Sequence, residues 1–196
     1  MRRIHFHLAA AVGWALLSAA ARAQETNACC AWEPRTRLEA LELKTGAVIV
    51  KGTTQLGAVP ARVGSVAVRC KEYTDASTGQ RDYGVAVEVK VSEQLEDTAL
   101  IDYDELDGLL KGLEHISKLD FTASSLTSFE ASYATKGGLR VAVHGSRRTG
   151  FIEASVQSQS NRFHRAGVSI SMTELAQLRI LMEQAKVKLD AIRAGK

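Results

Sequence analysis

The sequence predicts an α+β fold made of an internally duplicated β-β-β-β-α unit, with antiparallel sheets that each have a packed C-terminal helix. Three observations lead to this prediction. The chain has 196 residues, of which 45% are apolar and 24% are charged, and this composition is typical of a protein with one sizeable core. Segments with an apolar residue at every second position precede an amphipathic helix. The same order then occurs again in the second half of the chain.

Residues 1–23 are predicted to be a secretory signal peptide. Arg2 and Arg3 precede an apolar stretch, and Ala21-Arg22-Ala23 supplies a cleavage site with small residues at its two key positions. We therefore expect the mature protein in the periplasm or the medium. No stretch approaches the roughly 20 apolar residues that a spanning helix needs, so no membrane span is predicted.

Export also changes the interpretation of the charges. The chain has 25 basic and 22 acidic residues, and three of the arginines lie in the signal peptide, so the mature protein is neutral. An excess of basic residues would suggest that the protein binds nucleic acid, but the neutral mature protein gives little support for this function. The charges nevertheless separate along the chain, because residues 46–121 have 13 acidic and 8 basic side chains whereas residues 122–196 have 5 and 11. Either the two halves attract each other, or the basic half attracts an anionic partner.

Three cysteines remain after cleavage: Cys29, Cys30 and Cys70. In an oxidising compartment thiols tend to pair, and a ring between adjacent cysteines is strained, so we expect one of the first two to bond to Cys70. The third thiol either stays buried or links two chains into a homodimer. Lipidation of Cys29 or Cys30 is a less favoured alternative, because residues 24–27 separate them from the apolar stretch.

Residues 24–45 are predicted to form an N-terminal arm, in which residues 38–44 form a short helix or an edge strand. A first half, residues 46–121, follows. Its alternating segments predict strands at Ala47–Lys51, Gln55–Val59, Val63–Tyr73, Tyr83–Val91 and Thr98–Ile101. Asp102 and Glu105 have the spacing of a capping box. The helix that they would begin has a stripe of apolar residues, namely Leu106, Leu109, Leu110, Leu113 and Ile116.

The second half, residues 122–196, repeats this pattern. Strands are predicted at Ser128–Thr135, Leu139–His144, Phe151–Val156 and Val168–Ile170. A helix then begins at Ser171, with the apolar stripe Leu175, Leu178, Met182, Ala185, Leu189 and Ile192. Glu105 and Glu174 occupy the same place relative to the two helices, which alone is weak evidence because capped amphipathic helices resemble one another. The matching strands favour a duplication within a single domain, residues 46–196.

The chain offers few groups for catalysis. His115, His144 and His164 are too far apart in sequence for a helical metal-binding pair, and each is expected at the surface. The sequence contains no nucleophile elbow, phosphate-binding glycine loop or calcium loop. We therefore predict no catalytic residue, no metal site and no cofactor. A secreted hydrolase without a recognisable motif stays as an alternative.

One basic cluster is the candidate ligand-binding site. Arg147 and Arg148 lie in a turn bounded by glycines, and Arg162, His164 and Arg165 lie in the next loop. These side chains could bind an anionic ligand together only if the two loops meet, although loops after consecutive strands can lie at opposite ends of a sheet. The main prediction is an exported, non-enzymatic binding or structural module, with an unknown protein or an anionic ligand as its partner.

The doubled β-β-β-β-α order resembles that of the Whirly-type single-stranded-DNA-binding proteins, over most of residues 46–193. This resemblance implies an alternative function, the binding of single-stranded nucleic acid or another polyanion. Stacking of bases on an exposed sheet face would require aromatic side chains, for which the candidates are Tyr83, Tyr103, Tyr133 and Phe129.

Overall fold

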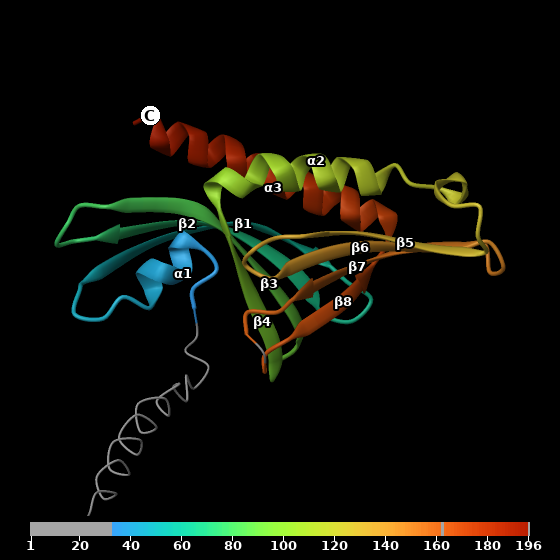
Figure 1. Ribbon diagram of the computed structural model, residues 1–196, viewed down its shortest axis with the longest axis horizontal. Helices are drawn as coiled ribbons and strands as arrows, with labels where there is room; N and C mark the ends of the chain where they lie inside the picture. Colours follow the sequence, from blue (N-terminus) through green and yellow to red (C-terminus); the bar gives the residue numbers. More distant parts are fainter. Residues whose placement is uncertain (1–32, 162, 196) are drawn as a thin grey trace, which may run out of the picture. The chain divides into compact units, whose positions relative to one another are not determined.

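The computed structural model describes residues 33–161 and 163–195. A compact unit begins at Pro34 and contains both predicted halves (Figure 1). The predicted signal peptide, Cys29 and Cys30 lie outside the described residues, as does Arg162.

The first half forms a four-stranded antiparallel sheet whose strands are neighbours in sequence order. Its strands are β1 (Ile49–Pro60), β2 (Ser65–Asp75), β3 (Arg81–Ser92) and β4 (Leu95–Asp102). A single 3-10 turn, η1 (Tyr103–Glu105), leads from β4 into the helix α2 (Leu106–Ser117).

The second half repeats this order after a short 3-10 turn, η2 (Phe121–Ala123). Its antiparallel strands, again in sequence order, are β5 (Ser128–Ala134), β6 (Leu139–Ser146), β7 (Phe151–Ser158) and β8 (Ala166–Ile170). The helix α3 (Met172–Arg193) follows β8. The duplicated α+β fold predicted from the sequence is thus confirmed.

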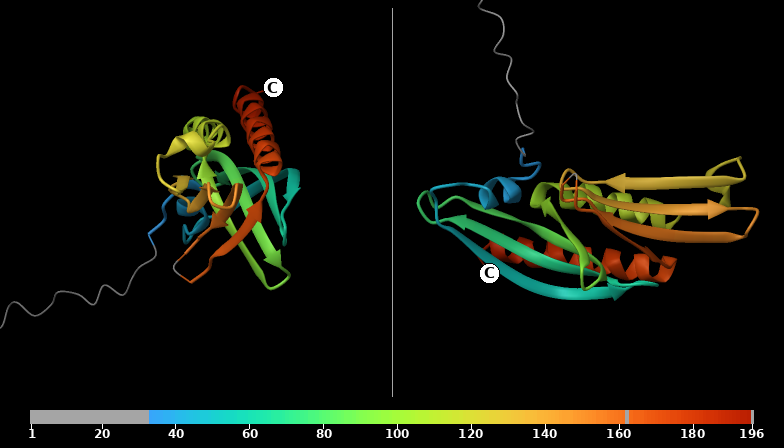
Figure 2. Two further views of the ribbon diagram at one scale, coloured as in Figure 1. Left: turned by 90° about the vertical axis from the view of Figure 1, so that its right-hand side faces the viewer. Right: turned by 90° about the horizontal axis from the view of Figure 1, so that it is seen from below.

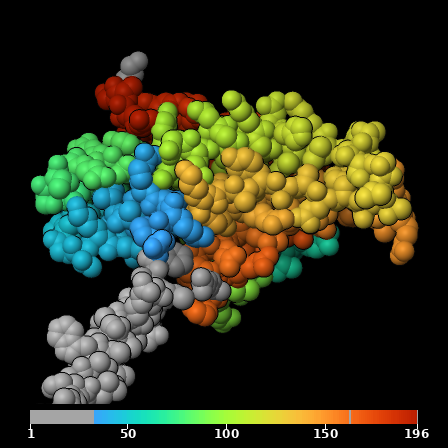
Figure 3. Space-filling model, viewed as in Figure 1, coloured from blue at the N-terminus to red at the C-terminus, as the bar shows by residue number. Residues whose placement is uncertain are grey.

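Each helix packs on the sheet of the other half. The helix α2 contacts β5 and β6, whereas α3 contacts mainly β1 and β2, and the two helices also contact each other. Figure 2 shows both helices on the same side of the two sheets, with α3 behind β1 and β2 and α2 behind the second sheet. In the space-filling view, the yellow-green atoms of α2 lie directly against the orange atoms of the second sheet (Figure 3). Each helix therefore packs mainly on the sheet of the other half, although α3 also contacts β7 of its own half.

One apolar core joins the two halves. It includes the alternating valines of β3 and the predicted stripes of both helices except Ile192, and Leu106, Leu109, Leu175 and Leu189 are fully buried. Burial of one leucine side chain contributes about 1.5–3 kcal/mol, so the stripes alone supply a large part of the driving force for folding.

A pair of glycines lets α2 approach β5 closely. A Cβ atom on Gly112 would lie 2.3 Å from Cδ2 of Tyr133, and one on Gly108 would lie 2.8 Å from the Tyr133 hydroxyl oxygen. The tyrosine ring therefore occupies the space that side chains at these two helical positions would fill. This explains why two residues of low helix propensity stand within α2.

The structure first differs from the sequence prediction at β1. The sequence predicts two short strands there, but the structure has one continuous edge strand with a bulge at Leu56, where the pairing shifts from Gln55 with Arg69 to Gly57 with Val68. The predicted break between two strands was wrong. It was predicted because residues 52–54 lack apolar alternation. Such alternation is not required over residues 50–55 of this edge strand, whose side chains are all exposed.

The predicted capping box forms in the second half but not in the first. In α3, the Ser171 hydroxyl accepts a hydrogen bond from the Glu174 N–H at 3.2 Å, and the Glu174 carboxylate accepts one from the Ser171 N–H at 2.6 Å. In the first half, Asp102 makes no such bond to its own helix. The prediction was wrong there because η1 separates Asp102 from α2.

Asp102 instead binds the predicted short helix of the N-terminal arm, which forms α1 (Arg37–Glu42). The Asp102 carboxylate accepts hydrogen bonds from the N–H groups of Arg37 at 2.8 Å and Leu38 at 3.2 Å. Leu38 and Leu41 pack on the outer face of the first sheet, beside Tyr73. The outer face of that sheet is therefore partly covered, whereas no described helix packs on the outer face of the second sheet.

Candidate functional site

The predicted basic cluster is divided between two ends of the second sheet. Arg147 and Arg148 lie in the turn before β7, whereas His164 and Arg165 lie in the segment after it. Since β7 has eight residues, it separates the two groups by the length of a full strand, roughly 26 Å. The structure does not bring these side chains together.

Two of these arginines also have partners of their own. The Arg147 guanidinium donates hydrogen bonds to the carbonyl oxygens of Phe121, Ser124 and Ser125, and so fixes the segment between the halves. Arg165 donates to the Gln157 side chain. Arg148 and His164 are exposed. Arg147 is therefore a structural residue of this turn, which the sequence did not indicate.

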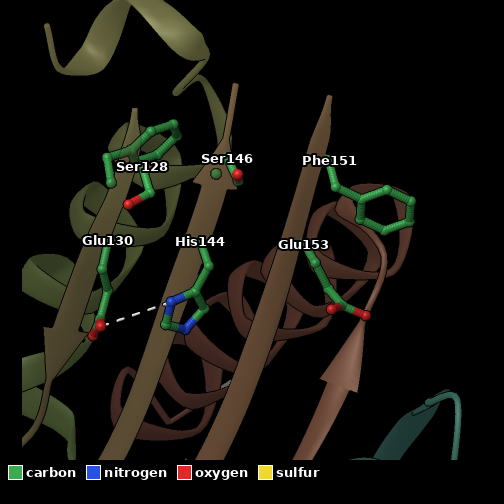
Figure 4. Close-up of a pocket in the computed structure, with 8 residues that line it drawn as sticks. Ser128, Glu130, His144, Ser146, Phe151 and Glu153 are labelled. Carbon is green, nitrogen blue, oxygen red and sulfur yellow. Dashed lines mark ion pairs between the residues drawn. The ribbon is translucent and has the colours of Figure 1, made fainter. Parts of the chain in front are cut away.

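The structure brings together a different group of side chains, on the outer face of the second sheet. The strand register places Glu130 of β5 opposite His144 of β6, and His144 opposite Glu153 of β7. Figure 4 shows the three side chains in a row across neighbouring strands, with His144 in the middle. We call these residues the Glu130–His144–Glu153 row.

The histidine of this row makes two polar contacts. Its Nδ1 atom lies 3.7 Å from Oε2 of Glu130, and its Nε2 atom lies 3.4 Å from the Ser155 hydroxyl oxygen. The side chains of His144 and Glu130 are 49% and 46% exposed. The contacts therefore form in water, where a single ion pair contributes little to stability.

Both carboxylates of the row also have an arginine partner. Glu130 forms an ion pair with Arg140 on the neighbouring strand. Glu153 forms one with Arg62 at 2.7 Å, and Arg62 lies in the loop between β1 and β2. The formal charges of the two carboxylates and the two guanidinium groups cancel. The row is thus polar but carries no surplus charge.

A shallow hollow of about 450 Å³ contains the row. At one end of it lies Phe151, whose side chain is 59% exposed (Figure 4). The residues that line the hollow are Ser128, Phe129, Glu130, His144, Gly145, Ser146, Phe151 and Glu153. The hollow therefore combines hydroxyl, carboxylate and imidazole groups with the exposed aromatic ring of Phe151.

Ser155, His144 and Glu130 stand in the order of a hydrolase triad, but the surroundings of Ser155 do not suit acyl transfer. Such chemistry needs free N–H groups beside the nucleophile to stabilise the oxyanion. Ser155 lies on β7, which pairs with β6 on one side and β8 on the other, so the sheet uses the N–H groups next to it. Within the described residues, no three histidine, cysteine, aspartate or glutamate side chains have a metal-binding arrangement.

The four aromatic residues considered for base stacking do not lie on an outer sheet face. Tyr133 packs on the α2 glycines, and Phe129 packs on Gly145. Tyr83 packs against the core. The Arg193 guanidinium lies over the Tyr103 ring, with its Cζ atom 3.8 Å from the ring centroid. The Tyr103 hydroxyl donates a hydrogen bond to Asp190. These positions leave none of the four rings free to stack on a base.

Cys70 is buried in the core, where its thiol lies 3.7 Å from the carbonyl oxygen of Ala185 in α3. Burial raises the pKa of this thiol, although Lys188 opposes the effect. The predicted disulfide from Cys70 to Cys29 or Cys30 stays a prediction, because both partners lie outside the described residues.

Among the residues in and beside the row, the sequence singled out only His144, as a surface histidine, and gave no role to Glu130, Glu153 or Ser155. All four lie on the outer face of strands in which exposed and buried residues alternate, so the sequence indicates that they face outward. Only the register of the three strands, however, places them side by side. Alternation within one strand does not contain that information.

No helix in the described part of the chain is long and apolar enough to span a membrane. The chain matches no protein-family model, no curated protein and no solved structure. None of these comparisons supports the expected resemblance to the Whirly-type proteins, which rests on the order of the elements alone.

Proposed function

We propose that the protein is an exported, non-enzymatic binding module that holds its ligand on the outer face of the second sheet. The observation that carries this proposal is the Glu130–His144–Glu153 row, which lies in a hollow of about 450 Å³ on a face that no described helix covers. Concave sites with a few convergent polar groups are the usual binding sites of proteins.

The rigidity of this face supports the proposal. The three strands that carry the row are joined by continuous antiparallel pairing, and ion pairs hold both glutamates. A ligand would therefore meet a sheet backbone that is already ordered, which reduces the entropy lost on binding. The inner face of the same sheet is fixed by α2, so the hollow stands on a packed support.

The proposal is tested by adding probes of several chemical classes to the isotope-labelled mature chain, residues 24–196. The probes are neutral oligosaccharides, heparin, single-stranded DNA, spermine and a mixture of short peptides. Saturable shifts of the backbone amide signals of Glu130, His144 and Glu153 with one probe class would support the proposal. Binding confined to other residues, or the absence of binding to all probes, would contradict it.

A second assay separates the module from an enzyme. Esters, phosphoesters and glycosides are offered to the wild type and to the His144→Ala and Ser155→Ala variants. We expect no turnover, because Ser155 lacks free N–H donors for an oxyanion. Robust turnover that either substitution abolishes would make the protein a hydrolase.

The polyanion alternative predicts a different response. If Arg148 and Arg165 bound heparin or single-stranded DNA, their replacement by serine would weaken binding, and affinity would fall steeply with salt. We expect neither effect, because these side chains lie at opposite ends of β7.

A further inference from the structure

We infer that the ligand of the outer face is a neutral oligosaccharide, bound along the Glu130–His144–Glu153 row with one sugar ring on Phe151. This inference rests on the proposed function, because it assigns a chemical class to the ligand of the same hollow.

The balanced charges around the row favour neither polyanions nor polycations as ligands. Each carboxylate already has a guanidinium partner, Arg140 for Glu130 and Arg62 for Glu153. A polyanion would meet the two glutamates, and a polycation would meet the two arginines. A neutral ligand leaves both ion pairs intact and gains hydrogen bonds to them.

The donors and acceptors of the hollow match a ligand rich in hydroxyl groups. A paired carboxylate keeps lone pairs that accept hydrogen bonds, and serine hydroxyls and the imidazole both donate and accept. Ser128, Ser146 and His144 supply such groups from two neighbouring strands, which lie about 4.8 Å apart. Because each sugar hydroxyl also donates and accepts, a saccharide can satisfy this mixed surface.

The aromatic end of the hollow adds an apolar contact. The Phe151 side chain is 59% exposed and lies at the end of the row, in register with Ser146 and Ser128 (Figure 4). A pyranose ring has one face of C–H groups, which packs on an aromatic ring while its edges form hydrogen bonds. An exposed phenyl group beside paired acids and hydroxyls suits such a two-sided ligand.

The test uses the mature chain and three uncharged hexasaccharides of glucose and N-acetylglucosamine: cellohexaose, maltohexaose and chitohexaose. Binding is measured by calorimetry and located by amide shifts in magnetic resonance spectra. We expect at least one hexasaccharide to bind at the row. Its affinity should change by less than about twofold between about 50 and about 200 mM salt, because no counterions are released.

Phe151 and Phe163 form a matched pair of variants. Both side chains are strongly exposed, but Phe163 is 93% exposed and does not line the hollow. We expect Phe151→Ala to weaken hexasaccharide binding by roughly tenfold, which corresponds to about 1.4 kcal/mol. Phe163→Ala should leave affinity unchanged, and Glu153→Gln should weaken it. Thermal unfolding of each variant checks that the fold is kept.

Two results would overturn the inference in distinguishable ways. If no hexasaccharide binds, but heparin, single-stranded DNA, spermine or a peptide shifts the amide signals of the row, the ligand class is wrong and the binding face remains. If no probe of any class shifts these signals, both the inference and the proposed function fail. Equal weakening by Phe151→Ala and Phe163→Ala would also contradict the inference.

Discussion

Asp75 shows how a single residue anchors a turn. It is fully buried at the end of β2, where its carboxylate pairs with Lys44 and accepts hydrogen bonds from the Ser77 hydroxyl, the Ser77 N–H and the Thr78 N–H. These interactions, first of all the hydrogen bond from Lys44, lower the pKa of Asp75 below its usual range. The charged carboxylate therefore stabilises the folded state, because protonation would remove the negative charge that pairs with Lys44 and would weaken the hydrogen bonds that the carboxylate accepts.

The first prediction concerns the pH dependence of this residue. A folded-state pKa below the unfolded value of about 3.9 gives stability that is present above that pH and is lost as the pH falls through the folded pKa. We expect Asp75→Asn to lower the free energy of unfolding at neutral pH. The difference from the wild type should shrink below about pH 4. Urea unfolding between acid and neutral pH measures it.

Asp107→Asn serves as the control for Asp75→Asn, because the Asp107 side chain is 72% exposed. It should have little effect at any pH, as exposed ion pairs usually contribute little. A constant difference between Asp75→Asn and the wild type down to strongly acid pH would contradict the role of the Asp75 charge.

Arg147 and Arg148 are adjacent residues with different environments, and they give the second prediction. Arg147 holds three backbone carbonyls of the segment between the halves, whereas Arg148 is exposed in the turn. We expect Arg147→Ala to lower the free energy of unfolding by about 1 kcal/mol. Arg148→Ala should change it by less than about 0.5 kcal/mol. Denaturant unfolding compares the two variants, and equal effects would disprove the assigned role of Arg147.

At the scale of elements, the contact of α2 with β5 depends on the space above two glycines. Replacement of a helical glycine by alanine ordinarily stabilises a helix by about 1 kcal/mol. At Gly112 the new Cβ would lie 2.3 Å from the Tyr133 ring, so the ring or the helix must shift. Overpacking of this kind costs about 1–3 kcal/mol.

The third prediction follows from these opposing effects. We expect Gly112→Ala to destabilise the protein in the wild-type background and to stabilise it in a Tyr133→Ala background, where the ring is absent. Thermal and urea unfolding of the two single variants and the double variant measure the coupling. The same sign of effect in both backgrounds would show that Tyr133 does not set the glycine requirement.

At the scale of the whole molecule, the exchange of helices makes each half depend on the other. The stripe of α2 is buried against β5 and β6, and that of α3 against β1 and β2. Further links join the halves, since Asp97 of β4 accepts hydrogen bonds from the Ser158 hydroxyl at 2.7 Å and the Ser160 N–H at 2.8 Å. A single half would leave its sheet and its helix stripe facing water.

The fourth prediction is that the two halves fold only together. Residues 24–125 and 126–196 are expressed together and separately, with the cut before Leu126, an exposed residue between η2 and β5. We expect the fragments to copurify in equal amounts and to unfold in one cooperative transition. Each fragment alone should lack cooperative unfolding, because its apolar surfaces stay uncovered. A fragment that unfolds cooperatively as a monomer would contradict this dependence.

The sequence by itself determined the elements and their repetition. Within the described residues, alternation located seven of the eight strands closely and divided only β1, and the two leucine-rich stripes located both long helices. Ser171 and Glu174 formed the predicted capping box because the groups involved are three residues apart and interact locally. Local periodicity therefore sufficed wherever the interactions are local.

The tertiary structure alone decided what lies beside what. Asp102 has the same sequence signal as Ser171, yet it caps α1, which precedes it by more than 60 residues. The helix stripes fit either sheet, and only packing placed each on the opposite half. Glu130, His144 and Glu153 come together because strand register aligns them, and register depends on pairing across strands that no single segment encodes. For that reason the sequence directed attention to the arginine turns, whereas the fold assembled the candidate site on the outer face of the second sheet.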